Sequence, residues 1–277
     1  MDMFVKRVLI FDSGVGGLSI YSEIAKINPT IKCHYLFDNA YFPYGELPRD
    51  KLVHRITQLL TDFTKQYPTD LIVIACNSAS TIALDALRAV FSVPIVGVVP
   101  AIKPATLITQ NNVIGLLATP GTIERAYTET LIKQFAAEKM VLRIGSTKLV
   151  TLAEDKLLGK TLDQEDFKKI LAPWTSAQQA EWPDTLVLGC THFPLIKEEI
   201  RACFSYPIHF VDSGAAIALR VKKLLNEMMI KKELKTTSLV VENTVFYTQS
   251  FINQTHYLSL NKRFISEGFK KMILFEG

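Results

Sequence analysis

The feature that most constrains the fold is a run of branched apolar residues at positions 71–74, which leads through Ala75 to Cys76. A strand that is apolar throughout is buried on both faces, as in a parallel sheet covered by helices. Small polar residues follow, and helical apolar spacing begins at Ile82. Cys76 is therefore predicted at a strand's carboxyl end and a helix N-terminus, where α/β sheets bind ligands. Backbone N–H groups there favour an anion, including a thiolate.

A second unit of the same design lies further along the chain. Residues 185–188 form a short, mostly apolar strand that leads through Gly189 to Cys190. Each cysteine unit is preceded by a strand that ends in a turn of small residues, at positions 12–17 before Cys76 and at positions 118–122 before Cys190. This repeated order predicts two similar halves that face each other.

Composition and apolar runs exclude several classes of protein. Thirty-one basic and 27 acidic residues give a net charge of +4, and no basic run is dense enough to indicate nucleic-acid binding. No apolar run approaches the roughly 18 residues of a membrane span. The first strand leads straight into Asp12 rather than into a signal-peptide cleavage site. The four cysteines lack CxxC spacing and are expected to be free thiols, so we expect a cytoplasmic protein without membrane or nucleic-acid partners.

Two matched thiols narrow the chemistry. His192 lies two residues from Cys190, but a zinc site needs three or four ligands, so no metal site is predicted. A thiol protease or amidase needs one nucleophile, which leaves the second cysteine without a role. Proton transfer at one carbon from opposite faces uses both, because a thiolate removes the α-proton and a thiol returns a proton to the other face. The pattern favours a cofactor-independent racemase.

Several segments together resemble the glutamate racemases of the aspartate/glutamate racemase superfamily. They are residues 11–17, 43–45, 75–80, 119–123 and 189–194, and the resemblance runs from about residue 5 to about residue 215. It implies an α/β fold of two pseudo-symmetric lobes, each a mostly parallel sheet flanked by helices, with the active site in the cleft between them. It also implies that neither pyridoxal phosphate nor a metal takes part.

The lobes can be assigned along the chain. Residues 93–100 form a short apolar strand interrupted by prolines and are the predicted crossing between lobes. We assign residues 1–98 and 210–277 to the first lobe, which carries Asp12 and Cys76. Residues 99–209 form the second lobe, which carries Cys190 and His192. Within it, residues 172–183 are predicted to form a surface loop with a helical turn.

The resemblance also implies roles for individual residues. Cys76 and Cys190 are the acid/base pair, with Asp12 assisting Cys76 and His192 assisting Cys190. The residues expected to hold the carboxylates and the ammonium group of glutamate are Ser13, Tyr44, Gly45, Asn77, Ser78, Thr119, Thr122 and Thr191. Asp38 and Glu154 are expected to be further acids at the edge of the site.

The chain departs from the family pattern at two places. Ser78 stands where the family usually has threonine, which preserves the hydroxyl, and residues 145–147 read Gly-Ser-Thr where Ala-Cys-Pro is common. His192 favours glutamate over aspartate, because related aspartate racemases usually carry an acidic residue there. The alternatives are a non-catalytic amino-acid-binding protein and a one-thiol decarboxylase or maleate isomerase relative. The second thiol disfavours the first alternative, and Asp12 together with His192 disfavours the second.

The resemblance implies a biological role and an assembly as well. D-Glutamate is a building block of bacterial cell-wall peptide, so the enzyme would supply peptidoglycan synthesis. Family members are often dimers, and we expect a homodimer.

Overall fold

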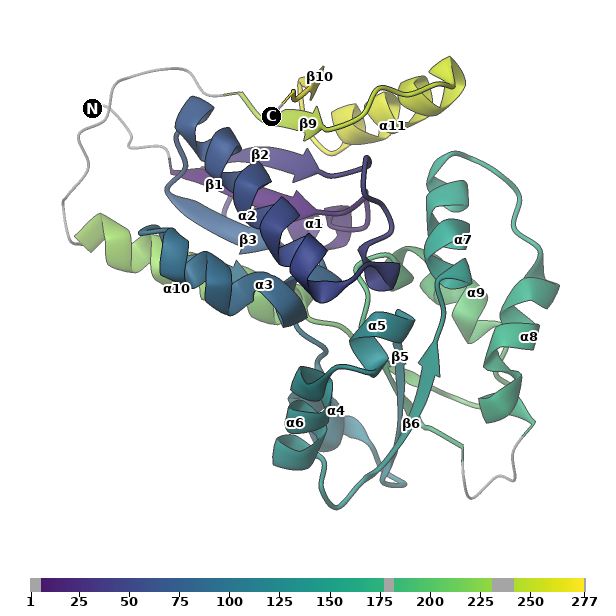
Figure 1. Cartoon of the computed structure of the whole chain (residues 1–277). Helices are drawn as coiled ribbons and strands as arrows, with labels where there is room; N and C mark the ends of the chain where they lie inside the picture. The colour runs from purple at the N-terminus through teal and green to yellow at the C-terminus, as the bar shows by residue number, and fades with distance from the viewer. Residues whose placement is uncertain (1–5, 177–181, 231–241, 277) are drawn as a thin grey trace.

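Two separate parallel sheets organise the molecule (Figure 1). The computed structural model describes residues 6–176, 182–230 and 242–276. The larger sheet has the strand order β10-β9-β2-β1-β3-β4, and the smaller has the order β6-β5-β7-β8. The strands are β1 (Arg7–Asp12), β2 (Lys32–Phe37), β3 (Leu71–Ile74), β4 (Ile95–Gly97), β5 (Val113–Ala118), β6 (Met140–Gly145), β7 (Thr185–Leu188), β8 (His209–Val211), β9 (Thr244–Tyr247) and β10 (Lys271–Leu274). The predicted fold class, α/β with parallel sheets flanked by helices, is confirmed.

Helices cover both faces of each sheet. They are α1 (Leu18–Ile27), α2 (Arg49–Gln66), α3 (Asn77–Val90), α4 (Ile102–Ile108), α5 (Pro120–Ile123), α6 (Ala126–Phe135), α7 (Lys148–Leu157), α8 (Gln164–Thr175), α9 (Lys197–Arg201), α10 (Gly214–Ile230) and α11 (Gln254–Ser266), with 3₁₀ turns η1 (Tyr44–Glu46) and η3 (Phe193–Ile196). On the larger sheet, α1, α10 and α11 pack on one face and α2 and α3 on the other. On the smaller sheet, α7 and α8 oppose α4 and α6.

The strand before Cys76 is buried on both faces, as its apolar run predicts. Leu71 and Val73 point into the core under α1 and α10, whereas Ile72 and Ile74 point into the core under α2 and α3. All four side chains are fully buried. Side chains of a strand alternate between faces, so only a continuous apolar run fills both cores.

The two halves repeat one topology, which confirms the predicted similarity between them. Strands β2-β1-β3-β4 follow the same order as β6-β5-β7-β8. Cys76 follows β3 and Cys190 follows β7, the equivalent strand. Parallel strands of one sheet end at the same edge, so Asp12 at the end of β1 lies at the same edge as Cys76.

The chain passes between the sheets twice. It leaves the larger sheet after β4 and returns after β8, when α10 packs against α1. The Ser213 hydroxyl donates a hydrogen bond to the Val99 carbonyl oxygen at 2.6 Å, so the two crossings are tied together. Because β8 pairs with β7, the smaller sheet extends to Val211.

The helical turn predicted within residues 172–183 is present, but it is the end of a longer helix, and Trp174 in it is buried rather than at the surface. Helix α8 continues to Thr175 even though Pro173 lies inside it. Phe167, Leu171 and Trp174 are spaced along one helix face and are buried in the core of the smaller sheet. Burial of these large side chains outweighs the cost of the proline. Residues 177–181 of this stretch lie outside the described residues.

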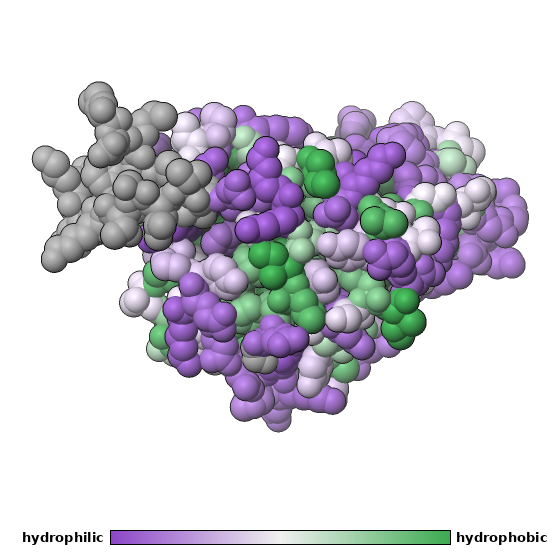
Figure 2. Space-filling model, turned by 90° about the horizontal axis from the view of Figure 1, so that it is seen from above, coloured by the Kyte–Doolittle hydropathy of each residue, from purple (hydrophilic) through white to green (hydrophobic). Residues whose placement is uncertain are grey.

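Mixed charge spreads over the exterior. Hydrophilic residues make up most of the face shown in Figure 2, with a smaller hydrophobic area near its centre. Within the described ranges, no helix is both long and apolar enough to cross a bilayer.

Candidate active site

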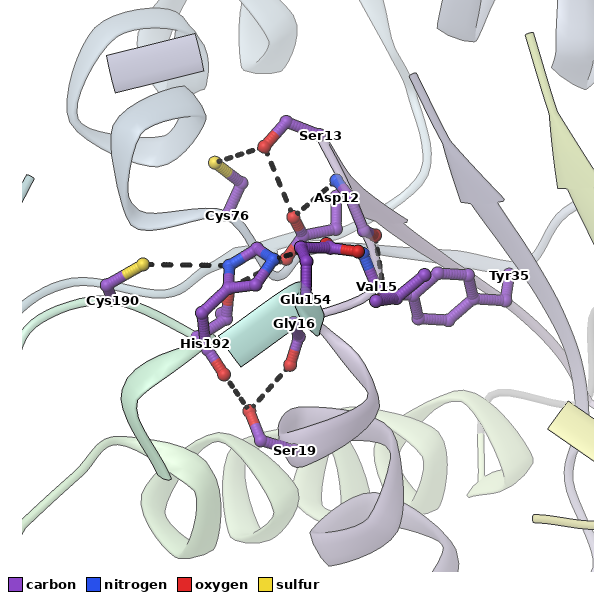
Figure 3. A network of polar contacts seen from close by, with 12 residues as sticks. Asp12, Ser13, Val15, Gly16, Ser19, Tyr35, Cys76, Glu154, Cys190 and His192 are labelled. Atoms are coloured by element: carbon purple, nitrogen blue, oxygen red, sulfur yellow. Dashed lines mark hydrogen bonds and ion pairs between the residues drawn. The ribbon is translucent and has the colours of Figure 1, made fainter. Parts of the chain in front are cut away.

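Cys76 lies where the sequence predicts it, between β3 and α3. It is the N-cap residue of α3, and its sulfur accepts a hydrogen bond from the backbone N–H of Ala79 at 3.5 Å. The Ser13 hydroxyl lies 3.7 Å from the same sulfur. The thiol is buried, with 6% of the residue exposed. Figure 3 shows this sulfur and that of Cys190 on the same side of the polar network.

Cys190 occupies the equivalent position in the second half. It follows β7, is 8% exposed, and its sulfur lies 3.7 Å from Nδ1 of His192. The two thiols are close enough for the charge of one to affect the other. Each thiol therefore has its own polar neighbour, Ser13 for Cys76 and His192 for Cys190 (Figure 3).

Asp12 connects the two halves. Its Oδ1 atom accepts hydrogen bonds from the Gly14 backbone N–H at 3.0 Å and from the Ser13 hydroxyl at 3.4 Å. Its Oδ2 atom accepts one from the Thr191 hydroxyl at 3.0 Å. Asp12 thus reaches Cys76 through Ser13, and it also anchors the loop after Cys190. The carboxyl group is fully buried, and this burial raises its pKa.

His192 bridges Cys190 and Glu154. Its Nε2 atom lies 2.8 Å from Oε1 of Glu154, and that oxygen also accepts a hydrogen bond from the Val15 backbone N–H at 3.2 Å. Glu154, on α7, is thus a direct partner of the histidine. Burial acts to lower the pKa of His192, but the hydrogen bonds to Cys190 and Glu154 raise it well above 6.5. The imidazole therefore favours its charged form between two acidic groups.

The glycine-rich turn after β1 lets the halves approach closely. A Cβ atom on Gly16 would lie 2.4 Å from Nδ1 of His192, closer than real Cβ contacts allow. Ser19 then ties the same turn to the second half, because its hydroxyl donates hydrogen bonds to the carbonyl oxygens of Gly16 and Thr191, both at 2.9 Å. The glycines of this turn therefore admit side chains of the other half.

The expectation that a helix N-terminus favours the thiolate fails for Cys76. The Ala79 N–H and the Ser13 hydroxyl do lower the pKa of this thiol, but burial is a larger effect, and Asp12 adds like-charge repulsion. Together they raise the pKa to about 12. With this pKa, Cys76 is a neutral thiol at neutral pH, suited to donate a proton.

Three hydroxyl groups, those of Ser78, Thr119 and Thr122, form a second polar cluster. The Ser78 hydroxyl lies 3.1 Å from that of Thr119 and 3.2 Å from that of Thr122, and the Thr119 hydroxyl donates to Thr122 at 3.0 Å. Ser78 belongs to α3 and both threonines belong to the second half. The cluster is buried. Hydroxyl groups can reorient to donate, so together they can bind a carboxylate.

Most of the expected residues line one small cavity. Its volume is about 20 Å³, and its walls include Ser13, Tyr44, Gly45, Cys76, Asn77, Ser78, Thr119, Cys190, Thr191 and His192. Pro43, Val150 and Gly189 complete the lining. Asp12, Thr122 and Glu154 lie behind these residues and contact them through the hydrogen bonds above.

Asp38 is not among the residues that line the cavity; it contacts one of them, Tyr44, from behind. Its carboxylate accepts hydrogen bonds from the Tyr44 hydroxyl at 2.7 Å, from the Arg55 guanidinium at 2.8 and 3.0 Å, and from the Thr248 hydroxyl at 2.6 Å. This fully engaged carboxylate fixes the segment that carries Tyr44 and Gly45. Asn77 differs, because its buried Oδ1 atom has no hydrogen-bond partner among the described residues.

In the part of the chain that the structure describes, no three His, Cys, Asp or Glu side chains gather in a way that could hold a metal ion. The groups available for chemistry are the two thiols, the carboxylates, the histidine and the hydroxyls.

Comparison with known proteins identifies the family. The Asp/Glu/Hydantoin racemase family model matches residues 17–221. Glutamate racemase from Pasteurella multocida is 51% identical over 252 residues, which are 90% of each chain. The Vibrio cholerae enzyme is 54% identical over 219 residues, 79% of this chain and 80% of that one. The chain belongs to the glutamate racemases of this family.

The solved structures agree. The crystal structure of Escherichia coli glutamate racemase, in complex with L-glutamate and the activator UDP-MurNAc-ala, matches with a TM-score of 0.90 and 43% identity, and the match covers 98% of each chain. The resemblance seen in the sequence is therefore confirmed. As a glutamate racemase, the chain is an isomerase.

Two further residues that support the candidate site were not predicted from the sequence. Ser19 and Arg125 both hold backbone atoms of site residues in place. Ser19 is one of several polar residues on an amphipathic helix, and nothing local marks it out. Arg125 lies between α5 and α6, outside both helices, and nothing local marks it out either.

Proposed function

We propose that this chain interconverts L-glutamate and D-glutamate by a two-thiol proton transfer, without a cofactor. The observation that carries the proposal is the pair of buried thiols on the two halves, each beside its own polar partner and both lining one cavity. A single nucleophile would leave one of these two equivalent thiols unused. Inversion at one carbon requires a group on each of its faces.

In the proposed L-to-D direction, the Cys190 thiolate removes the α-proton. The Cα–H bond breaks, the proton moves to the sulfur, and the electron pair stays on the substrate. The Cys76 thiol then gives its proton to the opposite face of the α-carbon and becomes a thiolate. The D-to-L direction reverses the roles, with Cys76 as base and Cys190 as acid. In each turnover one sulfur takes up a proton from the substrate and the other sulfur gives one to it.

The polar partners have separate tasks in this proposal. The His192 imidazolium gives a charge-assisted hydrogen bond to a thiolate on Cys190, and Glu154 keeps the imidazole charged and oriented. Ser13 lies between Asp12 and the Cys76 sulfur, and its hydroxyl supports negative charge on that sulfur when it turns to donate there instead of to Asp12. Asp12 opposes that charge by repulsion, so a thiolate formed on Cys76 takes up a proton readily.

The polar groups at the cavity match the charged groups of glutamate. Ser78, Thr119 and Thr122 offer hydroxyl donors for one carboxylate, and Ser13 with the Tyr44–Gly45 segment offers donors for the other. The unpartnered Asn77 oxygen and the Thr191 hydroxyl can accept hydrogen bonds from the ammonium group. The E. coli relative, solved with L-glutamate, supports this choice of substrate.

We propose that the lobes separate to admit glutamate between the two thiols. A cavity of about 20 Å³ holds only about one water molecule. We propose that the half built on the larger sheet moves relative to the half built on the smaller sheet, which ends with β8, and that the two crossings act as the hinge. Closure then removes water from both thiols before proton transfer.

The product suits the supply of D-glutamate for peptidoglycan synthesis, and we propose this role from the family. A cytoplasmic location and a homodimer stay predictions; light scattering at micromolar concentration tests the dimer.

Circular dichroism of the purified protein with L-glutamate, without added cofactor, tests the activity. The signal should decay to zero as the racemic mixture forms. A rotation that stays constant for hours at high enzyme concentration refutes the proposal.

A further inference from the structure

Arg125 is a partly buried arginine beside the hydroxyl cluster, and no carboxylate pairs with it among the described residues. Its Nε donates a hydrogen bond to the Gly121 carbonyl oxygen at 2.6 Å, and its Nη1 donates one to the Ser78 carbonyl oxygen at 3.3 Å. Both acceptors are neutral backbone groups. A guanidinium stays charged in proteins, so this site holds a positive charge without a counter-ion.

The other arginines near the sheet ends differ in this respect. Arg55 forms a two-pronged ion pair with Asp38, and Arg7 forms one with Asp70. Burial lowers the pKa of Arg125, which reflects the cost of keeping its charge away from water. A partly dehydrated, unpaired charge is unfavourable unless a bound anion compensates it.

Three segments of the site meet at this guanidinium. Ser78 lies on α3, Gly121 lies on α5, and the Gly45 segment packs against α5. A Cβ atom on Gly121 would lie 2.4 Å from the Gly45 carbonyl oxygen and 3.1 Å from Nη2 of Arg125. The same segments carry the hydroxyls of Thr119 and Ser78 that line the cavity. Arg125 therefore holds together the wall that faces the substrate.

The positive charge of Arg125 adds an electrostatic role to this structural one. Glutamate carries two carboxylates, and its site already contains Asp12 and Glu154. Neutral hydroxyls bind an anion more weakly than a charge-assisted arrangement does. The Arg125 charge also interacts favourably with a thiolate on Cys76.

We propose that Arg125 is the positioning residue and counter-charge for the substrate carboxylate held by the Ser78, Thr119 and Thr122 hydroxyls. This inference rests on the proposed glutamate activity. Arg125 acts through the hydroxyls and the Ser78 backbone, without contact to the reacting carbon. Its loss weakens substrate binding more than it slows proton transfer.

The test compares Arg125→Gln, which removes the charge, with Arg125→Lys, which keeps it. Arg143→Gln is the matched control, because Arg143 lies on β6 of the same half and pairs with Glu129. Arg125→Gln should raise the KM for glutamate about tenfold, equivalent to about 1.4 kcal/mol, and change kcat less than about threefold. The KM of Arg125→Lys should lie between those of the wild type and Arg125→Gln. Arg143→Gln should change neither KM nor kcat.

Binding is measured separately, from the dependence of Tm on glutamate concentration. The glutamate-induced rise in Tm should be smaller for Arg125→Gln than for the wild type, which tests Arg125 even without turnover. An unchanged KM and an unchanged Tm response in Arg125→Gln overturn the proposal. So does an equal loss of kcat in the Gln and Lys variants at constant KM, which would indicate a brace only. A wild type that binds glutamate without racemising it refutes the activity alone.

Discussion

Glu154→Gln isolates the charge that Glu154 contributes at His192. The two side chains meet at 2.8 Å, with His192 2% and Glu154 20% exposed. Glutamine keeps an oxygen at the same chain length but removes the negative charge. A hydrogen bond to a charged group contributes about 1.5–3 kcal/mol, against about 0.5–1.5 kcal/mol for a neutral one. The substitution should therefore cost about 1–1.5 kcal/mol, or roughly 5- to 15-fold in rate.

The assay separates the two thiols. L- and D-glutamate have equal free energies, so kcat/KM must fall by the same factor in both directions and cannot show which side is affected. A glutamate analogue with a leaving group on the β-carbon can show which thiol is affected, because elimination needs only the thiol that removes the proton. Glu154→Gln should slow elimination from the L analogue roughly 5- to 15-fold, and should leave elimination from the D analogue nearly unchanged.

Glu199→Gln is a suitable control. Glu199 pairs with Lys156 in the same half and is 23% exposed, close to the exposure of Glu154. This variant should eliminate from both analogues at the wild-type rate. Equal losses on both analogues in Glu154→Gln would refute the assignment of Glu154 and His192 to the Cys190 side.

Three further predictions follow from the same contacts. Cys76→Ala and Cys190→Ala should each abolish racemisation in both directions, while the first still eliminates from the L analogue and the second from the D analogue; racemisation by either at near the wild-type rate rules out two bases. Gly16→Ala places a Cβ atom 2.4 Å from Nδ1 of His192, so it should cost about 1–3 kcal/mol of stability and slow elimination from the L analogue; an unchanged Tm would contradict this. Burial lowers the pKa of His34 from 6.5 to about 4, so between these values only the unfolded chain binds the proton. Its contribution to stability is complete above pH 6.5 and falls by about 3 kcal/mol on acidification to pH 4; urea unfolding should show a smaller loss in His34→Gln.

Much of the fold follows from local sequence. Residues 71–74 are apolar at every position, and a strand of that kind belongs to a sheet covered on both faces. Cys76 and Cys190 each follow such a strand, and parallel strands of one sheet end at the same edge, so the sequence also predicts the edge at which each thiol lies. The surface loop with a helical turn predicted over residues 172–183 was only partly right. Pro173 is a strong local signal against a helix, but burial of Trp174, which depends on the rest of the second half, extends α8 to Thr175.

Within the site, the sequence by itself determined which chemical groups follow the sheet ends: two thiols, Asp12, His192 and the hydroxyls. Only the tertiary structure decided their partners and charge states. Glu154 meets His192 from a helix 38 positions away in sequence, and Arg125 meets Ser78 across 47 positions. The N-cap position of Cys76 favours a thiolate, but burial raises the pKa of that thiol to about 12. Sequence periodicity records which face of an element is apolar, whereas ionisation and pairing depend on the solvent and charges removed when separate segments pack together.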